Sequence, residues 1–153
     1  MTIEIDVKAP YRTLVDTDFL QQAAQCVLTA ERAQGDVTLV LTDDDTVAQL
    51  NQQFLGKTGP TDVLSFPAMA DDEPFVLPPE AAIYLGDVII AMPFTQQQAQ
   101  RLQRPLMHEL ALLTIHGLLH LLGYDHATPD EKAIMWAKQD AVLSGLGIGP
   151  MDV

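Results

Sequence analysis

The sequence predicts a single small α+β domain, with a mixed sheet of about four strands and about five packed helices. The chain has 153 residues, which is enough to build one hydrophobic core. Its apolar fraction of 48% is typical of a folded protein. Segments with the two-residue period of strands are interspersed with segments that carry helix caps and helical periodicity. Because no internal repeat or domain boundary appears, we expect residues 1–153 to form one domain.

The chain begins with a predicted strand and a predicted helix. Residues 2–7 alternate polar and apolar side chains, which is the period of a strand that is buried on one face. Asp16 or Thr17 can cap a helix, because their side-chain oxygens accept hydrogen bonds from N–H groups of the first turn. The apolar stripe of this helix continues to about Ala33.

A second strand and a second helix follow. Residues 37–41 form a continuous apolar run that is typical of a buried strand. Thr42 and the three aspartates after it predict a helix start, since side-chain oxygens and negative charge both favour a helix N-terminus. This role accounts for the aspartates without a metal ion. We expect residues 51–60 to form a loop, because they contain two glycines and a proline.

The middle of the chain predicts two more strands joined by an acidic connection. Residues 63–66 have the composition of a strand. Residues 70–79 are rich in acidic residues and proline, so we expect a solvated connection or a flexible hairpin tip. Residues 81–92 predict the last strand, with a bulge at residues 86–87 where a glycine interrupts it.

Three more helices complete the predicted fold. Pro93 opens a glutamine-rich helix at residues 96–102, and Pro105 opens a long apolar helix, because proline is favoured in a first helical turn. Residues 128–131 place a cap, a first-turn proline and a capping-box glutamate in the order that starts a C-terminal helix. We expect residues 146–153 to form a frayed tail.

Composition limits the classes of function. The net charge of −13 argues against a broad nucleic-acid surface, but a small basic groove could still form from Lys57, Arg101 or Arg104. The single cysteine, Cys26, excludes an internal disulfide framework and fits a reducing compartment. Charged and histidine side chains interrupt the apolar run at residues 106–122, and the N-terminus lacks a signal-peptide pattern. We therefore expect a cytoplasmic protein with no membrane partner.

The strongest functional signal is a group of three histidines. His116 and His120 are four residues apart on a predicted helix, so both can point at one metal ion. Gly123 can end the helix and turn the chain back, which brings His126 to the same ion. Three protein ligands leave a fourth position for water, as in catalytic zinc sites. We predict one Zn²⁺ per chain, with the metal-bound water as the catalytic group of a hydrolase.

The same spacing matches the metzincin proteases and predicts a zincin-like metal helix. Those enzymes need a glutamate directly after the first histidine as the general base, and this chain has Gly117 there. Peptide hydrolysis is therefore the weaker interpretation, and it survives only if another carboxylate replaces the missing one. A metal ion can also activate water for the cleavage of a phosphodiester.

Other residues have both a functional and a structural interpretation. Asp125 either orients a ligand imidazole through a hydrogen bond or is an ordinary turn residue. Thr61 and Ser65 either line a substrate groove at a strand end or serve turn chemistry. We expect Glu109 to stabilise the helix dipole from the first turn, and Trp136 to be a core residue of the last helix.

The motif at residues 116–126, His-Gly-Leu-Leu-His-Leu-Leu-Gly-Tyr-Asp-His, strongly resembles that of the YbeY family of bacterial rRNA maturation factors, which are described as metal-dependent endoribonucleases. Residues 60–67 (Pro-Thr-Asp-Val-Leu-Ser-Phe-Pro) and 85–88 (Leu-Gly-Asp-Val) match two further blocks of that family, and the resemblance covers most of the chain. It implies a small α+β fold and a zinc ion held by the three histidines. It also implies processing of small-subunit ribosomal RNA and ribosome quality control, with ribosomal RNA, the small ribosomal subunit and its assembly factors as partners.

The chain departs from the family at one position. The family usually has arginine after an Asn-x-x-aromatic segment, and this chain has Leu55 there. Leucine cannot form the bidentate phosphate contact of arginine, although Lys57 can offer a point charge. We expect a zinc-dependent, single-strand-specific endoribonuclease in which Lys57, Thr61 and Ser65 bind substrate. The alternative is a ribosome-assembly binding factor with little catalysis of its own.

Overall fold

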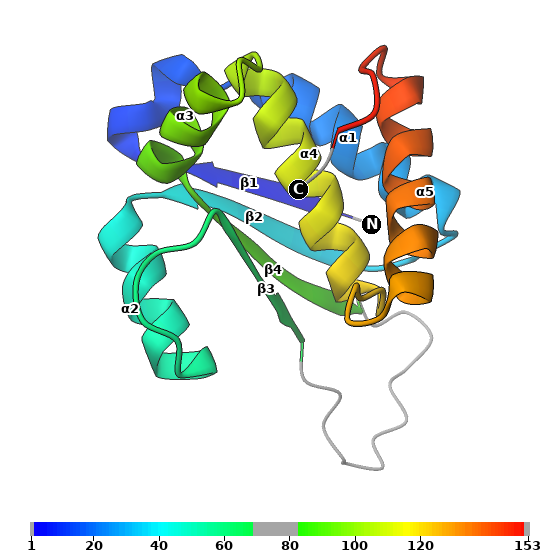
Figure 1. The fold of residues 1–153 in the computed structure, drawn as a ribbon, viewed down its shortest axis with the longest axis horizontal. Helices are drawn as coiled ribbons and strands as arrows, with labels where there is room; N and C mark the ends of the chain where they lie inside the picture. The colour runs from blue at the N-terminus through cyan, green and yellow to red at the C-terminus, as the bar shows by residue number, and fades with distance from the viewer. Residues whose placement is uncertain (1, 69–82, 152–153) are drawn as a thin grey trace.

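A four-stranded mixed sheet runs through the molecule (Figure 1). The computed structural model describes residues 2–68 and 83–151, so the predicted acidic connection at residues 70–79 lies outside the described residues. β1, β2 and β4 are parallel, and β3 pairs antiparallel with β4. This sheet confirms the predicted α+β fold. The order in space is β1 (Ile3–Val7), β2 (Asp36–Thr42), β4 (Tyr84–Ala91) and β3 (Val63–Pro67).

Helices cover both faces of this sheet. Helices α1, α4 and α5 share one core with β1, β2 and β4, whereas α2 packs on the opposite face against β3 and β4. The described residues contain five α-helices, as predicted, and one short 3-10 helix, η1, which was not predicted. The bounds are η1 (Ala9–Leu14), α1 (Thr17–Ala30), α2 (Asp44–Leu55), α3 (Met92–Arg101), α4 (Leu106–Leu121) and α5 (Pro129–Gly145).

Capping side chains start three of the helices where the sequence predicts. Asp16 accepts a hydrogen bond from the backbone N–H of Phe19 and begins α1. Asp43 caps α2 in the same way. Thr128 caps α5 by accepting from the N–H of Glu131. The aspartates after β2 therefore serve the helix start, which confirms the interpretation that needs no metal.

The predicted loop at residues 51–60 is wrong in its first half. Helix α2 continues to Leu55, because no helix-breaking residue occurs before Gly56. Gly56 adopts a left-handed conformation with φ of 66° and ends the helix. As a result, Leu55 and Asn51 occupy the last turn of α2 and face the same pocket as β3.

A bulge interrupts β4 close to the predicted position. Asp36 pairs with Tyr84 and Val37 pairs with Gly86, so one extra residue of β4 lies between these pairs. Gly86 has a φ of 140°, and a Cβ atom there would lie 2.3 Å from the carbonyl oxygen of Phe66. Only glycine allows this approach of β3 to β4.

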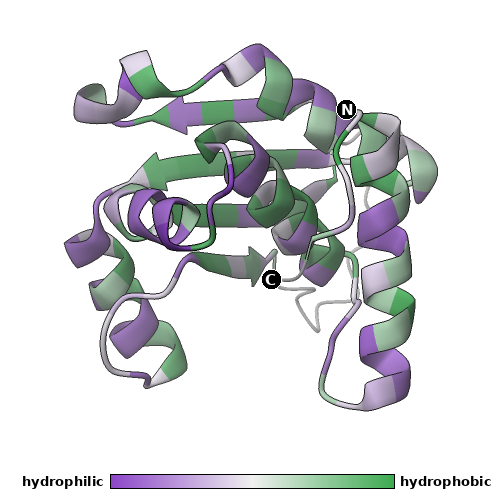
Figure 2. Cartoon of the chain, turned by 45° about the horizontal axis from the view of Figure 1, so that its top comes forward, coloured by the Kyte–Doolittle hydropathy of each residue, from purple (hydrophilic) through white to green (hydrophobic). Residues whose placement is uncertain are grey.

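Helix α4 lies at the centre of the core, between the sheet and its neighbours α1, α3 and α5 (Figure 1). All residues from Glu109 to Leu119 are buried, and Figure 2 shows that α4 is mainly hydrophobic, whereas β1 alternates hydrophilic and hydrophobic residues. Burial on all sides explains the apolar sequence of α4 without a membrane. None of the helices in the described ranges combines the length and the hydropathy that a membrane span needs.

The segment after α5 differs from the predicted frayed tail. Ile148 is only 5% exposed and belongs to the main core. The carbonyl of Met151 accepts a hydrogen bond from the side-chain amide of Gln139 on α5. The chain after α5 therefore packs back onto the domain up to residue 151.

Helix α4 rests directly on the sheet at Gly117. A Cβ atom at this position would lie 2.6 Å from Cγ1 of Val88 on β4. The Ser65 hydroxyl on β3 donates a hydrogen bond to the Gly117 carbonyl, at 3.0 Å. Position 117 therefore faces the sheet, and any larger side chain would push the helix that carries two of the predicted metal ligands away from it.

We expect Gly117→Ala to destabilise the fold by about 1–3 kcal/mol, because the new methyl group overpacks the contact with Val88. Denaturant unfolding measures the change. Gly145→Ala is the matched control, since a Cβ atom at this α5 residue meets nothing within 4 Å. The control should be neutral or stabilising by up to about 1 kcal/mol. Equal stability of Gly117→Ala and the native chain would contradict the close packing of α4 against Val88.

Candidate metal centre

The last turn of α4 and the turn after it bring three imidazoles together. The Nε2 atoms of His116 and His120 lie 3.1 Å apart. Gly123 adopts a φ of 101° after the helix, and the reversed chain places His126 beside them, with ring centroids 5.4 Å and 5.2 Å from the other two rings. One ligand atom from each histidine lies within 4.8 Å of the others. The three predicted ligands could therefore hold a metal ion.

Hydrogen bonds on the outer side set the tautomer of two of these rings. The Nδ1–H of His116 donates to Oε1 of Gln139, and the Nδ1–H of His120 donates to the carbonyl of Tyr124, both at 2.9 Å. Because both partners are acceptors, each Nδ1 carries the hydrogen and each Nε2 presents a lone pair inward.

The inward lone pairs fit a cation. Two lone pairs 3.1 Å apart repel each other unless a positive charge lies between them. The separation is close to the value of about 3.3 Å that two zinc–nitrogen bonds at a tetrahedral angle require. Three neutral nitrogen ligands are a donor set that suits zinc and related transition metals. The His116–His120 pair therefore fits a divalent metal ion in distance, and the three imidazoles fit one in chemistry.

Burial keeps His116 and His120 neutral. Desolvation lowers the pKa of His116 to about 4, and the hydrogen bond with Gln139 opposes the shift only in part. Desolvation also lowers the pKa of His120, with a further contribution from His126. A protonated imidazole cannot bind a metal, so a lowered pKa keeps both lone pairs available at neutral pH.

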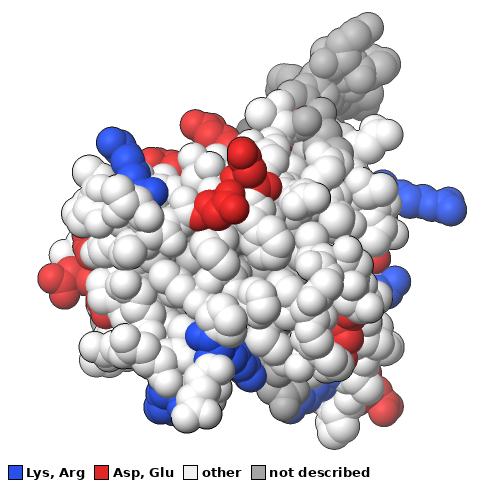
Figure 3. Space-filling model, turned by 90° about the horizontal axis from the view of Figure 1, so that it is seen from above, with Lys and Arg blue, Asp and Glu red and all other residues white. Residues whose placement is uncertain are grey.

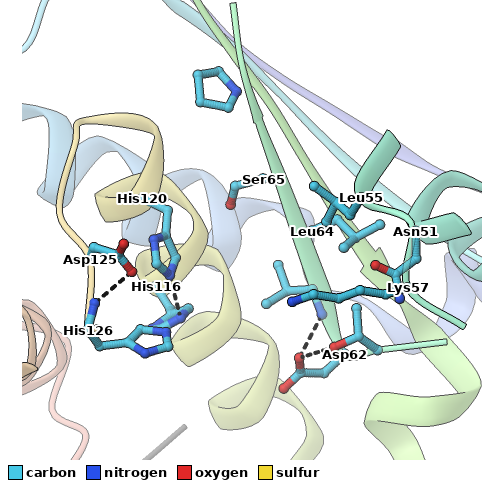
Figure 4. Close-up of a pocket in the computed structure, with 13 residues that line it drawn as sticks. Asn51, Leu55, Lys57, Asp62, Leu64, Ser65, His116, His120, Asp125 and His126 are labelled. Atoms are coloured by element: carbon cyan, nitrogen blue, oxygen red, sulfur yellow. Dashed lines mark hydrogen bonds between the residues drawn. The ribbon is translucent and has the colours of Figure 1, made fainter. Parts of the chain in front are cut away.

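A pocket of about 560 Å³ opens in front of the three histidines. Figure 4 shows the histidines on one side and the end of α2 with the start of β3 on the other. A cavity of this size is typical of a small-ligand site. The predicted substrate residues all line it, together with the position of the family arginine and two carboxylates: Lys57, Thr61, Ser65, Leu55, Asp62 and Asp125.

The predicted substrate residues differ in how their polar groups are used. Lys57 is exposed and forms no ion pair within the described part of the chain. The Thr61 hydroxyl lies 3.3 Å from Oδ1 of its neighbour Asp62. The Ser65 hydroxyl is already bonded to the Gly117 carbonyl. Of the three, Lys57 is therefore the residue whose polar group is most available to a substrate.

The role of orienting an imidazole belongs to residues other than Asp125. The Asp125 carboxylate accepts a hydrogen bond from the backbone N–H of His126, at 2.7 Å, which is the turn interpretation. Gln139, which the sequence did not indicate, holds His116 instead. No local signal marks Gln139, because it lies 23 residues after His116 on a different helix.

Trp136 borders the site. Its ring packs edge-on against His116 and His126, with centroids 5.7 Å and 5.5 Å away. The ammonium of Lys132 lies 5.1 Å from the indole centroid. The simple core interpretation of Trp136 is therefore incomplete, since the same side chain packs on the core and supports the third histidine.

Glu109 and Arg104 form a buried ion pair that corrects two expectations. Glu109 is 0% exposed, and its Oε2 lies 3.1 Å from Nη1 of Arg104. Its other oxygen accepts a hydrogen bond from Gln98, whose amide also donates to Asp62. Glu109 thus joins α3, α4 and β3 rather than only stabilising a helix dipole. Arg104 is committed to this pair, and Arg101 is exposed on α3 outside the pocket lining.

Comparison with known proteins places the chain among endoribonucleases. A family model described as Endoribonuclease YbeY matches residues 4–147. The protein called Endoribonuclease YbeY in Roseiflexus sp. strain RS-1 is 42% identical over 150 residues, which cover 96% of this chain and 94% of the relative. The protein of the same name in Chloroflexus aggregans is 40% identical, covering 97% of this chain and 99% of the relative. A solution structure from Thermotoga maritima matches with a TM-score of 0.64 at 28% identity, covering 94% of this chain and 88% of that one.

The lowered pKa of His116 predicts acid sensitivity of the metal-free protein. Between pH 6.5 and about 4 the unfolded chain takes up a proton that folded His116 excludes, so stability falls as the pH falls. The loss is at most about 1.4 kcal/mol per pH unit for this residue. Urea unfolding in the presence of a chelator, at about pH 7 and about pH 5, measures it. His116→Gln should lose less stability over the same interval, and an equal loss would contradict the assignment.

Proposed function

This chain belongs to the YbeY endoribonuclease family, and from that premise we propose that it is a zinc-dependent, single-strand-specific endoribonuclease acting in small-subunit ribosomal RNA maturation and ribosome quality control. Residues 1–153 act as one metal-dependent hydrolase domain in the cytoplasm. The observation that carries the proposal is the set of three clustered imidazoles that opens onto one pocket. The partners are ribosomal RNA, the small ribosomal subunit and its assembly factors.

The histidines provide the catalytic centre in this proposal. His116, His120 and His126 would hold one zinc ion, which supplies Lewis-acid activation of water and of a phosphoryl oxygen near neutral pH. Gln139 and the Tyr124 carbonyl keep two of the imidazoles in the metal-binding tautomer. Burial of His116 lowers the pKa of its imidazole, so this ligand stays unprotonated at neutral pH. The same burial keeps bulk water away from that side of the site.

Residues across the pocket bind and orient the substrate. Lys57 offers a positive charge to a phosphate group. The Thr61 hydroxyl can donate to the substrate only when it gives up its bond to Asp62. Ser65 acts mainly by holding β3 against α4, although its oxygen also faces the pocket. A pocket of this volume suits an unpaired nucleotide better than a duplex, which supports the single-strand preference.

The strong negative charge restricts how RNA can approach. Figure 3 shows one face of the molecule, on which most of the surface is neutral and the described Lys and Arg side chains lie at separate points and not in one continuous strip. At the pocket, we expect attraction to come from Lys57, the one Lys or Arg among its described lining residues, and from the metal centre. RNA affinity should depend only weakly on salt, since few phosphate contacts release few counterions.

The alternative function is a ribosome-assembly binding factor with little catalysis of its own. Leu55 favours it, because it lines the pocket at the position where the family usually has arginine. The protease interpretation has no comparable support, since position 117 faces Val88 and not the pocket.

We expect the zinc-loaded protein to cleave single-stranded ribosomal RNA, and His120→Ala or a chelator to abolish the cleavage. His108→Gln is the matched control, because it changes a histidine of the same helix outside the metal cluster. Incubation with ribosomal RNA, with ribosomes and with casein separates the possibilities. Binding to ribosomes without cleavage by the loaded protein would favour the binding factor. Cleavage of casein alone would contradict both.

Two substitutions on the α2 side of the pocket should change activity in opposite directions. Lys57→Ala should lower kcat/KM for RNA about tenfold or more, because a hydrogen bond to a charged group is lost. Leu55→Arg should raise it by restoring bidentate phosphate contact. Steady-state kinetics on a labelled single-stranded oligonucleotide measures both, with Lys8→Ala, a distant surface lysine paired with Asp6, as control. If kcat/KM does not rise in Leu55→Arg, Lys57 alone supplies the cationic contact with the phosphate.

A further inference from the structure

We propose that Gln139 is a positioning residue with two effects on the metal centre. Its amide holds His116 in the metal-binding tautomer, and its neutrality leaves the bound metal ion its full positive charge for an anionic ligand. This inference deepens the proposed function, because it assumes that the three histidines hold a divalent ion. It does not depend on cleavage of RNA.

Both polar atoms of the Gln139 side chain form hydrogen bonds. It is 0% exposed, and its Oε1 accepts the hydrogen bond from His116 Nδ1–H at 2.9 Å. Its Nε2 donates to the Met151 carbonyl at 3.5 Å, in the segment that packs back after α5. This second bond fixes which amide atom faces the imidazole. A buried amide without partners would be costly, so the pairing is specific.

The outer hydrogen-bond partners of His116 and His120 are neutral groups. The usual partner of a metal-binding histidine is a carboxylate or a backbone carbonyl. Here His120 has the Tyr124 carbonyl and His116 has the amide of Gln139. The pocket carboxylates bond elsewhere, Asp125 to the backbone of His126 and Asp62 to the backbone of Val63 and to Gln98. Within the described residues, neither of them pairs with a ligand imidazole.

The neutral shell matters because of the charge of the chain. The protein carries −13, and Lys57 is the one cation that lines the pocket among the residues described. A bound divalent ion with three neutral ligands keeps a charge of about +2, which makes it the largest positive charge in the pocket. Gln139 therefore favours the binding of a phosphate-type anion that the rest of the protein repels.

Substitutions at Gln139 should separate the two effects. Gln139→Met keeps the approximate volume but removes the acceptor, so we expect zinc affinity to fall about 10–100-fold. Gln139→Glu keeps an acceptor and adds a negative charge next to His116. We expect it to bind zinc at least as tightly as the native chain but to bind inorganic phosphate about tenfold more weakly.

Two readouts test this without any nuclease assay. Competition with a chromogenic chelator measures zinc affinity. Titration of inorganic phosphate into the Co²⁺-loaded protein, followed by visible absorption, measures anion binding at the metal. Gln100→Glu is the matched control, since it makes the same charge change on an exposed residue of α3 and should alter neither readout. Thermal unfolding of each variant checks that it is folded.

The outcomes distinguish this inference from the proposed function. Native zinc affinity in folded Gln139→Met would overturn the orienting role, and native phosphate affinity in Gln139→Glu would overturn the charge role. If Gln139→Glu does not fold, Gln139→Met still decides the orienting role. A native chain that binds neither Zn²⁺ nor Co²⁺ would overturn both the inference and the metal centre. A chain that binds metal as expected but cleaves no RNA would overturn only the nuclease.

Discussion

The direct contact of α4 with the sheet at Gly117 is the constraint on which the rest of the structure depends. The absence of a side chain lets the helix backbone approach Val88, and the Ser65 hydroxyl ties the same carbonyl to β3. Because this face of α4 lies against the sheet, His116 and His120 point into the pocket beside β3. The two helical histidines therefore face the pocket because of a packing contact.

Burial of α4 also governs the electrostatics of the site. The same desolvation that makes α4 a core helix lowers the pKa of His116 and His120 and keeps them neutral. Their charge-free donor set is compatible with the apolar core only because hydrogen bonds satisfy the outer nitrogens. Packing, protonation state and metal chemistry are thus consequences of one helix position.

A buried polar network connects the elements around the pocket. Arg104 neutralises Glu109, and Gln98 joins Glu109 to Asp62 at the start of β3. Such a network contributes little net stability, because desolvation offsets the attraction of the charges. Its geometric effect is specific, since it links α3, α4 and the strand that forms the opposite wall.

The α+β class, the caps at Asp16, Asp43 and Thr128, and the grouping of the three histidines could all be predicted from the sequence. Each depends on short-range spacing, which a linear pattern records. Three further features became visible only in the folded chain. Gln139 orients His116, and α2 extends to Leu55. Arg104 pairs with Glu109, which leaves Lys57 as the available cation in the pocket. Most of these outcomes are contacts between separate elements, and no local periodicity encodes a contact across the core.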